Sequence, residues 1–345
     1  MHNSLTIGTR GSQLALWQAQ FVKDQLERFF PELEVHLKII KTTGDTIQDR
    51  SLVGLGKGVF TKEIENALLA GDIDLAVHSL KDLPTELPQG LCITAIPTRE
   101  DPRDVLITDS GLPLNELLNG AKIGTTSPRR KAQLLHIRPD LQVVDVRGNI
   151  DTRLRKLHET DLDGIILAAA GIKRLGISHQ PSAVGDQQRG FSVNQKPLVT
   201  DSREVFRRKT DLKADGYFSQ FFDVERMVPA VGQGALAIEA RVADDRIEKL
   251  LAPLNDQETA AEITAERAVL ENLGGGCQVP IGAYAKHVDG ELSLISAVCH
   301  PEGTLRIVEK AKGELRAAQH LGEVVAEKLR ESGATGLLAV QGNLQ

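Results

Sequence analysis

Short apolar runs alternate with helix-forming stretches through the first half of this chain, and this alternation restricts the possible folds more than any other feature. Apolar runs typical of strands occupy residues 5–8, 34–40, 75–77, 92–96, 104–107, 121–124, 142–146 and 164–167. Helical patterns separate them, at residues 13–30 and 60–70 and in stretches that begin at Pro128, Asn149 and Ala169. Strands that alternate with helices build mostly parallel sheets. We therefore expect an α/β fold with two such sheets.

The chain is longer than a single hydrophobic core usually allows, so its 345 residues predict two or three domains. Residues 97–102 begin and end with proline and are expected to cross into a second domain. Residues 228–234 resemble a hinge. Residues 178–222 are polar and longer than an ordinary loop, and we expect an insertion that is disordered or folded onto the surface.

The last third of the chain has a different pattern. We expect a helix at residues 256–273, alternating strands over 281–312 with turns at 289–290 and 301–303, and a last helix at about 314–330. This order predicts a small α+β domain with an antiparallel sheet.

The charge of the chain is acidic overall but basic in the middle. The net charge of -6 at pH 7 argues against a general nucleic-acid binder. Between Lys122 and Arg174, however, eleven Lys and Arg stand against six Asp and Glu. A basic region in an acidic protein indicates a small polyanionic ligand.

The ends and the cysteines of the sequence bear on where the protein works. We expect no targeting peptide and no membrane span, and hence a cytoplasmic protein. Cysteine occurs only at Cys92, Cys277 and Cys299, without a C-x-x-C pair, so neither a disulfide framework nor a cysteine zinc site is expected. His78 and His136 lack the neighbours that a metal site needs, and we expect no metal.

Residues 74–84 place a polar turn directly after a buried strand. The apolar run at 75–77 is followed by Ser79, Lys81 and Asp82 before Pro84 ends the element. Open α/β sheets bind their ligands at the carboxyl ends of the strands. The alternative is that Lys81 and Asp82 are a solvated charge pair in a surface loop.

Several expected helix starts carry hydroxyl groups, cations or both. The free N–H groups and positive dipole of a helix N-terminus attract anions. A single such group is ordinarily a helix cap, as we expect of Ser12, whereas several in one chain indicate a ligand with many carboxylates or phosphates. The residues concerned are Arg10, Ser12, Lys57, Gly58, Thr61, Thr125, Thr126, Ser127, Pro128, Arg129, Arg130, Arg147, Gly148, Asn149 and Arg153.

Glycines mark two loops of interest. Residues 54–58 are glycine-rich but match neither a Walker A loop nor G-x-G-x-x-G, and we interpret them as a mobile loop or lid. Whether Lys57 and Lys62 touch substrate or only shape this lid stays open. Cys277 follows three glycines, which would let a thiol stand exposed, although a lone cysteine is more often inert.

Five motifs, in this order, resemble those of the porphobilinogen deaminases, a family also called hydroxymethylbilane synthases. They are VHSLKDLP at residues 77–84, GTTSPRR at 124–130, RGN at 147–149, AVGQG at 230–234 and GGCQVP at 275–280. The resemblance runs nearly end to end. Residues 178–222 are the exception, because they are much longer than the corresponding link in the common bacterial form.

The resemblance implies a monomer of three domains. Two would be type II periplasmic-binding-protein-like lobes with mixed, mostly parallel sheets, and the third a small α+β domain with a three-stranded antiparallel sheet. Domain 1 would comprise residues 1–98 and 230–252, domain 2 residues 99–229 with the insertion at 178–222, and domain 3 residues 253–345. The active site would lie between the first two.

The resemblance also implies the activity, a transferase step of porphyrin and heme biosynthesis. Four porphobilinogen molecules would be joined head to tail, with loss of ammonia, on a covalently bound dipyrromethane cofactor, and water would then release hydroxymethylbilane. Loss of ammonia leaves an electron-poor ring, so a carboxylate near the pyrrole N–H can stabilise positive charge and move the proton.

The family motifs imply the role of each site residue. Asp82 would be catalytic and would also contact the cofactor, and Cys277 would hold the cofactor through a thioether. The other cofactor-binding residues would be Ser79, Lys81, Thr125, Ser127, Arg129, Arg130 and Gly148. The substrate-binding residues would be Arg10, Ser12, Gln18, Arg147, Arg153 and Arg174, because arginine pairs well with the acetate and propionate groups of each pyrrole.

Two other function classes remain open from the residues alone. Paired α/β lobes joined by a hinge are also the architecture of non-catalytic solute-binding proteins. A phosphate-handling transferase could use the same helix starts, although the nucleotide motifs fail. The intact mass separates the three, since only the deaminase should carry a two-ring adduct.

Overall fold

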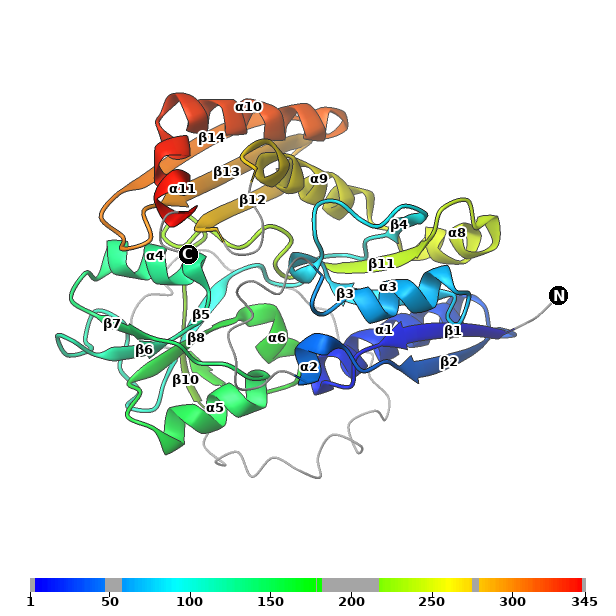
Figure 1. The fold of residues 1–345 in the computed structure, drawn as a ribbon, viewed down its shortest axis with the longest axis horizontal. Coiled ribbons are helices and arrows are strands. Elements are labelled where there is room, and N and C mark those ends of the chain that lie inside the picture. The colour runs from blue at the N-terminus through cyan, green and yellow to red at the C-terminus, as the bar shows by residue number, and fades with distance from the viewer. Residues whose placement is uncertain (1–3, 47–57, 178, 182–216, 275–278, 343–345) are drawn as a thin grey trace.

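The computed structural model describes residues 4–46, 58–177, 179–181, 217–274 and 279–342. Figure 1 shows these residues as two α/β lobes side by side, with a third part resting above them. Each part has its own sheet, so the described residues form three sheets.

The first lobe is built on a five-stranded sheet with the order β2-β1-β3-β11-β4. Its strands are β1 (Ser4–Thr9), β2 (Glu34–Ile39), β3 (Leu75–Ser79), β4 (Leu91–Ala95) and β11 (Leu236–Arg241). Strand β1 runs parallel to β2 and β3, whereas β11 is antiparallel to both of its neighbours. The helices are α1 (Gln13–Phe29), α2 (Thr43–Thr46), α3 (Lys62–Leu69) and α8 (Asp245–Leu251). Residues 75–78 of β3 are all buried, as expected of a central strand covered on both faces.

The second lobe is built on a six-stranded sheet with the order β7-β6-β8-β5-β10-β9. Its strands are β5 (Asp104–Thr108), β6 (Lys122–Gly124), β7 (Gln142–Val144), β8 (Gly164–Ala168), β9 (His179–Pro181) and β10 (Tyr217–Phe221). Only β5 runs against its neighbours β8 and β10. The helices are α4 (Pro128–Ile137), α5 (Ile150–Glu159) and α6 (Ala169–Arg174).

Two segments cross between the lobes, and each leads into the reversed strand of the sheet that it enters. Residues 96–103 connect β4 to β5, and residues 222–235 connect β10 to β11. The two segments are hydrogen-bonded to each other, since the amide of Glu100 donates to the carbonyl of Gly234 at 3.1 Å. Because both lobes meet at these segments, the carboxyl ends of their parallel strands can serve one site.

The expectation for residues 178–222 is wrong at its C-terminal end. Strand β10 lies inside the second sheet, between β5 and β9, and Phe222 after it is only 1% exposed in a core with Leu106 and Leu114. Pairing with β5 places this segment in the sheet although its sequence is only weakly apolar. Such an effect of tertiary context is not visible in the local sequence pattern. Residues 182–216 lie outside the described part of the chain.

The C-terminal domain has the expected antiparallel sheet, β12-β13-β14. Its strands are β12 (Ile281–Val288), β13 (Glu291–Cys299) and β14 (Arg306–Glu314), and its helices are α9 (Gln257–Asn272), α10 (Ala318–Glu331) and α11 (Ala334–Gly342). Asp289 and Gly290 both have positive φ in the first hairpin turn. The last long helix begins later than expected, because Glu314 still pairs with Glu291 in the sheet. The predicted fold class is confirmed: two α/β lobes with mixed sheets, and a small α+β domain with a three-stranded antiparallel sheet.

Candidate active site

The turn after β3 carries the two charged residues on which the sequence prediction centres. A short 3-10 helix at Leu80–Asp82 follows the strand. Leu80 and Leu83 are three residues apart and therefore share one side of this turn, where both are buried. Asp82 is exposed, and Lys81 is half-buried. The pKa of Lys81 is lowered to about 8 by burial and by the nearby charge of Arg130, which does not fit a solvated surface pair.

Helix α4 begins with two adjacent arginines that share one carboxylate. Arg129 donates from Nη1 to Oδ2 of Asp104 at 2.7 Å, and Arg130 donates from Nε to Oδ1 at 2.8 Å. All three side chains are buried. Burial by itself would raise the pKa of Asp104, but the two guanidiniums hold that pKa well below its usual range. Two cations therefore share one anion, and the helix start stays positive.

Gln233 ties this cluster to the segment that returns to the first lobe. Its Nε2 donates to Oδ1 of Asp104 at 3.0 Å and to the carbonyl of Pro102 at 2.7 Å, and its Oε1 accepts from Arg130 at 3.4 Å. Sequence reasoning missed both Asp104 and Gln233 as site residues. Two neighbouring arginines at a buried helix start indicate that a carboxylate must be near, but not which one.

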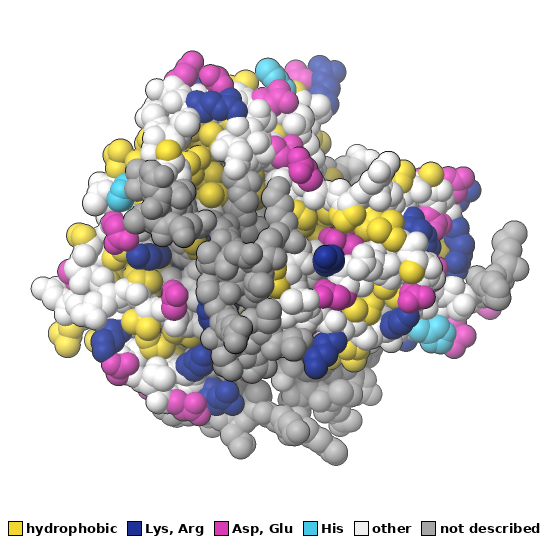
Figure 2. Space-filling view, in the orientation of Figure 1, with side chains coloured by type: hydrophobic (Ala, Val, Ile, Leu, Met, Phe, Trp, Pro, Cys, Tyr) yellow, Lys and Arg dark blue, Asp and Glu magenta, His cyan; other side chains and the backbone are white. Residues whose placement is uncertain are grey.

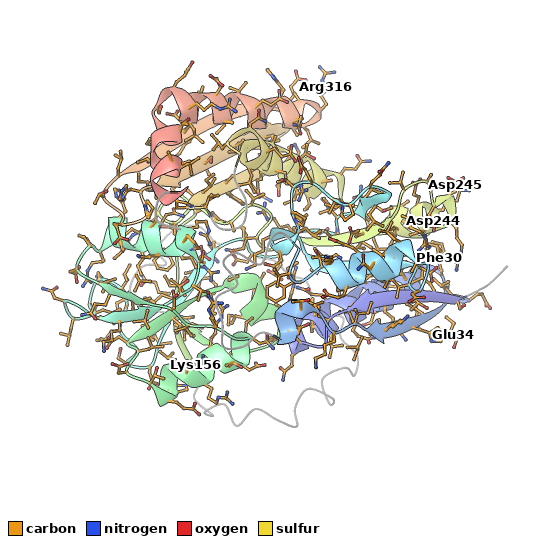
Figure 3. All side chains as sticks on the ribbon, in the orientation of Figure 1. Phe30, Glu34, Lys156, Asp244, Asp245 and Arg316 are labelled. Atoms are coloured by element: carbon orange, nitrogen blue, oxygen red, sulfur yellow. The ribbon has the colours of Figure 1, made fainter. Side chains whose placement is uncertain are left out.

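The loop before α5 is held by side chains from that helix. Arg153 donates from Nε to the carbonyl of Gly148 at 2.8 Å, and Lys156, labelled in Figure 3, donates to the carbonyl of Arg147 at 3.1 Å. Gly148 has a φ of +116°, and a Cβ there would lie 2.6 Å from Cγ2 of Thr152. No larger residue fits this loop without strain.

The charge of Arg153 interacts with Asp82, in the turn after β3. Burial, together with the charges of Arg130 and Arg147, lowers the pKa of Arg153 to about 10, while Asp82 opposes this effect. Residues from three separate elements therefore act on one another. The structure brings Lys81, Asp82, Arg130 and Arg153 near enough for their charges to interact.

Another predicted residue, Arg174, joins the two lobes. Arg174 of α6 donates from Nη2 to the carbonyl of Gly234 at 2.7 Å, and its guanidinium lies 5.7 Å from the ring centre of Trp17 on α1. Burial lowers the pKa of Arg174 to about 10. Gln18 of α1 donates to Oγ of Ser79 at 2.8 Å. Arg174 therefore links the second lobe to the first, whereas the hydrogen bond from Gln18 to Ser79 joins α1 and β3 within the first lobe.

The remaining predicted residues have local partners. The hydroxyl of Ser12 accepts from the amide of Ala15 at 3.3 Å, which is the ordinary capping role. Arg10 donates from Nε to Asp45 at 3.1 Å and lies 4.3 Å from the centre of the Phe60 ring.

The hydroxyls before α4 follow the same pattern. Thr125 is buried, and its hydroxyl accepts from the amide of Ser127 at 3.2 Å. Ser127 in turn caps α4 by accepting from the amide of Arg130 at 3.4 Å. The prediction for residues 54–57 and the role of Cys277 lie outside the described residues.

The charge distribution suits a ligand with several carboxylates. Figure 2 shows Lys and Arg side chains over the lobe that contains α5, in line with the basic middle of the sequence. Nε of Arg129 is buried and has no hydrogen-bond partner among the described residues. Carboxylates that entered here would offset the mutual repulsion of Lys81, Arg130 and Arg153.

The comparison with known proteins decides the family. Two family models match: "Porphobilinogen deaminase, dipyromethane cofactor binding domain" over residues 5–204, and "Porphobilinogen deaminase, C-terminal domain" over residues 260–331. The porphobilinogen deaminase of Syntrophotalea carbinolica is 44% identical, with 98% of this chain and 96% of that protein covered. The one of Geobacter metallireducens is 44% identical over 97% and 94%, and the one of Chlorobaculum parvum 42% identical over 98% and 98%.

The chain belongs to the porphobilinogen deaminase family. Its members are transferases that condense porphobilinogen on a dipyrromethane cofactor in tetrapyrrole biosynthesis. A solute-binding protein and a phosphate-handling transferase, the two alternatives, are not members of this family. Similarity to solved structures is distant: the methionine-binding protein MetQ is 12% identical with a TM-score of 0.40, covering 76% of this chain and 95% of that one.

The donors at the site fit the family's cofactor. A dipyrromethane carries several carboxylates, and the buried cations of lobe 2 together with the free Nε of Arg129, in the described part of the chain, can bind them. Among the described helices, none has the length and hydropathy to cross a bilayer. No three His, Cys, Asp or Glu side chains in the same part of the chain are arranged to hold a metal ion.

Proposed function

We propose that this chain adds four porphobilinogen molecules in turn to a dipyrromethane held between the two α/β lobes, and then releases hydroxymethylbilane by hydrolysis. One observation carries the proposal: cations from both lobes lie close enough to one exposed carboxylate for their charges to interact. Lys81 and Arg153 lie on different lobes, yet burial and the charge of Arg130 lower the pKa of each, and the charge of Asp82 opposes this effect in both. As rings are added, their acetate and propionate carboxylates can pair with these Lys and Arg side chains.

Binding of the cofactor is assigned to one set of residues. Cys277 holds the dipyrromethane through a thioether, and when bound this group supplies the pyrrole carbon to which new rings are joined. Burial and the start of α4 keep Arg129 and Arg130 rigid, so their guanidiniums meet carboxylates in a fixed geometry. The other residues of this set are Ser79, Lys81, Asp82, Thr125, Ser127 and Gly148.

Binding of substrate and of the lengthening chain is assigned to a second set. Arg174 is fixed where the lobes meet, by the carbonyl of Gly234, and Gln18 is fixed within the first lobe, by the hydroxyl of Ser79. Arg153 holds the loop at Gly148 through Nε, so its terminal nitrogens can reach a carboxylate. The set is completed by Arg10, Ser12 and Arg147.

Asp82 is assigned the proton transfer. Its carboxylate is exposed, whereas the leucines on the opposite side of the turn are buried, so the group faces outward from a fixed backbone. A carboxylate there can accept a hydrogen bond from a pyrrole N–H and stabilise the positive charge that appears when ammonia leaves. It can then take up the proton of that N–H.

The broader assignments follow the family as well. We propose a cytoplasmic monomer that uses neither nucleic acid nor a membrane as partner. Its three domains are residues 1–98 with 230–252, residues 99–229, and residues 253–345, which agree with the placement of the three sheets in the chain.

The test is incubation of the purified protein with porphobilinogen, followed by intact-mass spectrometry. The expected result is a resting mass above that of the sequence by a two-ring adduct at Cys277, transient masses with added rings, and release of ammonia and hydroxymethylbilane. Conversion of porphobilinogen by a protein that carries no pyrrole at Cys277 would overturn the proposal. So would a Cys277→Ser protein with full covalent loading.

A further inference from the structure

The turn that carries Asp82 belongs to lobe 1, but a residue of the C-terminal domain holds it in place. Arg267 of α9 donates from Nη2 to the carbonyl oxygens of Pro84 and Thr85, at 2.9 and 2.6 Å. These carbonyls come two and three residues after Asp82 in the chain. The contact therefore joins α9 to the backbone immediately beyond the catalytic turn.

The same face of α9 also packs against the apolar side of that turn. Ile263 lies four residues before Arg267 and so projects from the same face of the helix. It shares a buried cluster with Leu80 and Leu83, which flank Lys81 and Asp82. Gly232 of the return segment (residues 222–235) also packs closely on Leu80, because a Cβ there would lie 2.2 Å from Cδ2 of Leu80. The turn therefore packs against both α9 and the return segment.

In the sequence, helix α9 directly precedes the segment with the proposed cofactor anchor. It ends at Asn272, and Cys277 follows five residues later in the sequence. One rigid helix thus carries the contacts to the catalytic turn and precedes the residue that holds the growing chain.

We propose that Arg267 is a positioning residue, which sets the place of the Asp82 carboxylate by holding the carbonyls of Pro84 and Thr85. The proposal rests on the proposed role of Asp82. A proton-transfer group must lie within hydrogen-bond reach of the atom that it serves. A displacement of about 1 Å can lower a rate roughly 100-fold, so a backbone contact remote from the substrate can govern turnover.

The variant that tests this is Arg267→Gln, with Thr98→Val as the matched control. Thr98 donates to Asp256, the N-cap of α9, at 2.8 Å, and so joins the same two parts of the molecule without touching the turn. We expect Arg267→Gln to lower kcat by about 10- to 100-fold with KM changed less than about twofold, because no substrate contact is lost. Thr98→Val should keep both values, and Arg267→Lys should recover part of kcat.

A second measurement does not depend on activity. Hydrogen exchange of a peptide covering residues 80–87 should be faster in Arg267→Gln than in the wild type, and unchanged in Thr98→Val. If the wild type itself fails to convert porphobilinogen, the proposed function falls, and the exchange data still decide whether Arg267 holds the turn. Unchanged exchange would refute that contact.

Two kinetic outcomes would overturn the proposal. One is a wild-type kcat in folded Arg267→Gln. The other is an equal loss in Arg267→Gln and Thr98→Val that follows their melting temperatures, because the contact would then only join the domains. If Arg267→Gln does not fold, Arg267→Met, which keeps the apolar stem, is measured with the same expected results.

Discussion

Arg130 donates from Nε to Oδ1 of Asp104 at 2.8 Å, and both side chains are buried. Arg130 lies in the first turn of α4, and Asp104 is the first residue of β5, the strand that the chain enters on crossing into the second lobe. The same oxygen accepts from Gln233 of the return segment at 3.0 Å. One carboxylate thus fixes the cations of the site relative to both crossing segments.

Removal of this carboxylate should destabilise the protein strongly. Asp104→Asn leaves Arg129 and Arg130 without their counter-charge in a buried place, and breaking a buried pair in this way costs about 3–5 kcal/mol. We expect a loss of this size in the free energy of unfolding, measured by urea denaturation. Glu159→Gln is the control, because it breaks an exposed pair with Arg155 and should change stability little. Equal stability of the two variants would contradict the buried-pair account.

Loss of the Asp82 carboxylate should abolish turnover without unfolding the chain. Its side chain is exposed, so Asp82→Ala and Asp82→Asn should fold as the wild type does. Without the group that handles the proton, we expect kcat to fall by roughly 10²- to 10⁴-fold. Release of ammonia from porphobilinogen measures this, with Glu86→Gln, an exposed carboxylate on the same loop, as the control. Near-normal activity of Asp82→Ala would remove Asp82 from the mechanism.

Substitution of Arg153 should stall chain growth. In Arg153→Gln the held loop at Gly148 loses its Nε donor and the site loses a cation, so rings should bind but add slowly. Intact-mass spectra after a short exposure to porphobilinogen should show enzyme-bound intermediates that accumulate as a ladder. Arg155→Gln, on the exposed side of the same helix, should give the wild-type pattern. If no intermediate forms with Arg153→Gln, this residue acts at cofactor loading instead.

Loading of the cofactor should depend on pH through Lys81. Burial and the charge of Arg130 lower the pKa of Lys81 to about 8, so its positive charge is present below this pH and is lost as pH rises through it. We expect the rate at which cofactor-free protein is loaded to decline across that range. In Lys81→Arg the decline should move to higher pH, because arginine keeps its charge there. The same midpoint in both proteins would assign the decline to another group.

The local pattern of the sequence accounts for most of the elements. The apolar run at residues 75–77 of β3 and the caps at Ser12, Ser127 and Asp256 are recognisable because strand burial and helix capping depend on neighbours within a few residues. Strand β10 is not recognisable in this way, because its place in the sheet comes from pairing with β5 far away in the chain.

By itself, the sequence determined the two α/β repeats, the small C-terminal domain and the family, since these depend on period, spacing and motif. Only the tertiary structure decided that Asp104 neutralises Arg129 and Arg130, that Gln233 joins them to the return segment, and that Arg267 holds the turn of Asp82. The reason is physical: a buried charge needs a partner at about 3 Å, and any carboxylate or carbonyl that the fold brings there can serve, however distant in the chain.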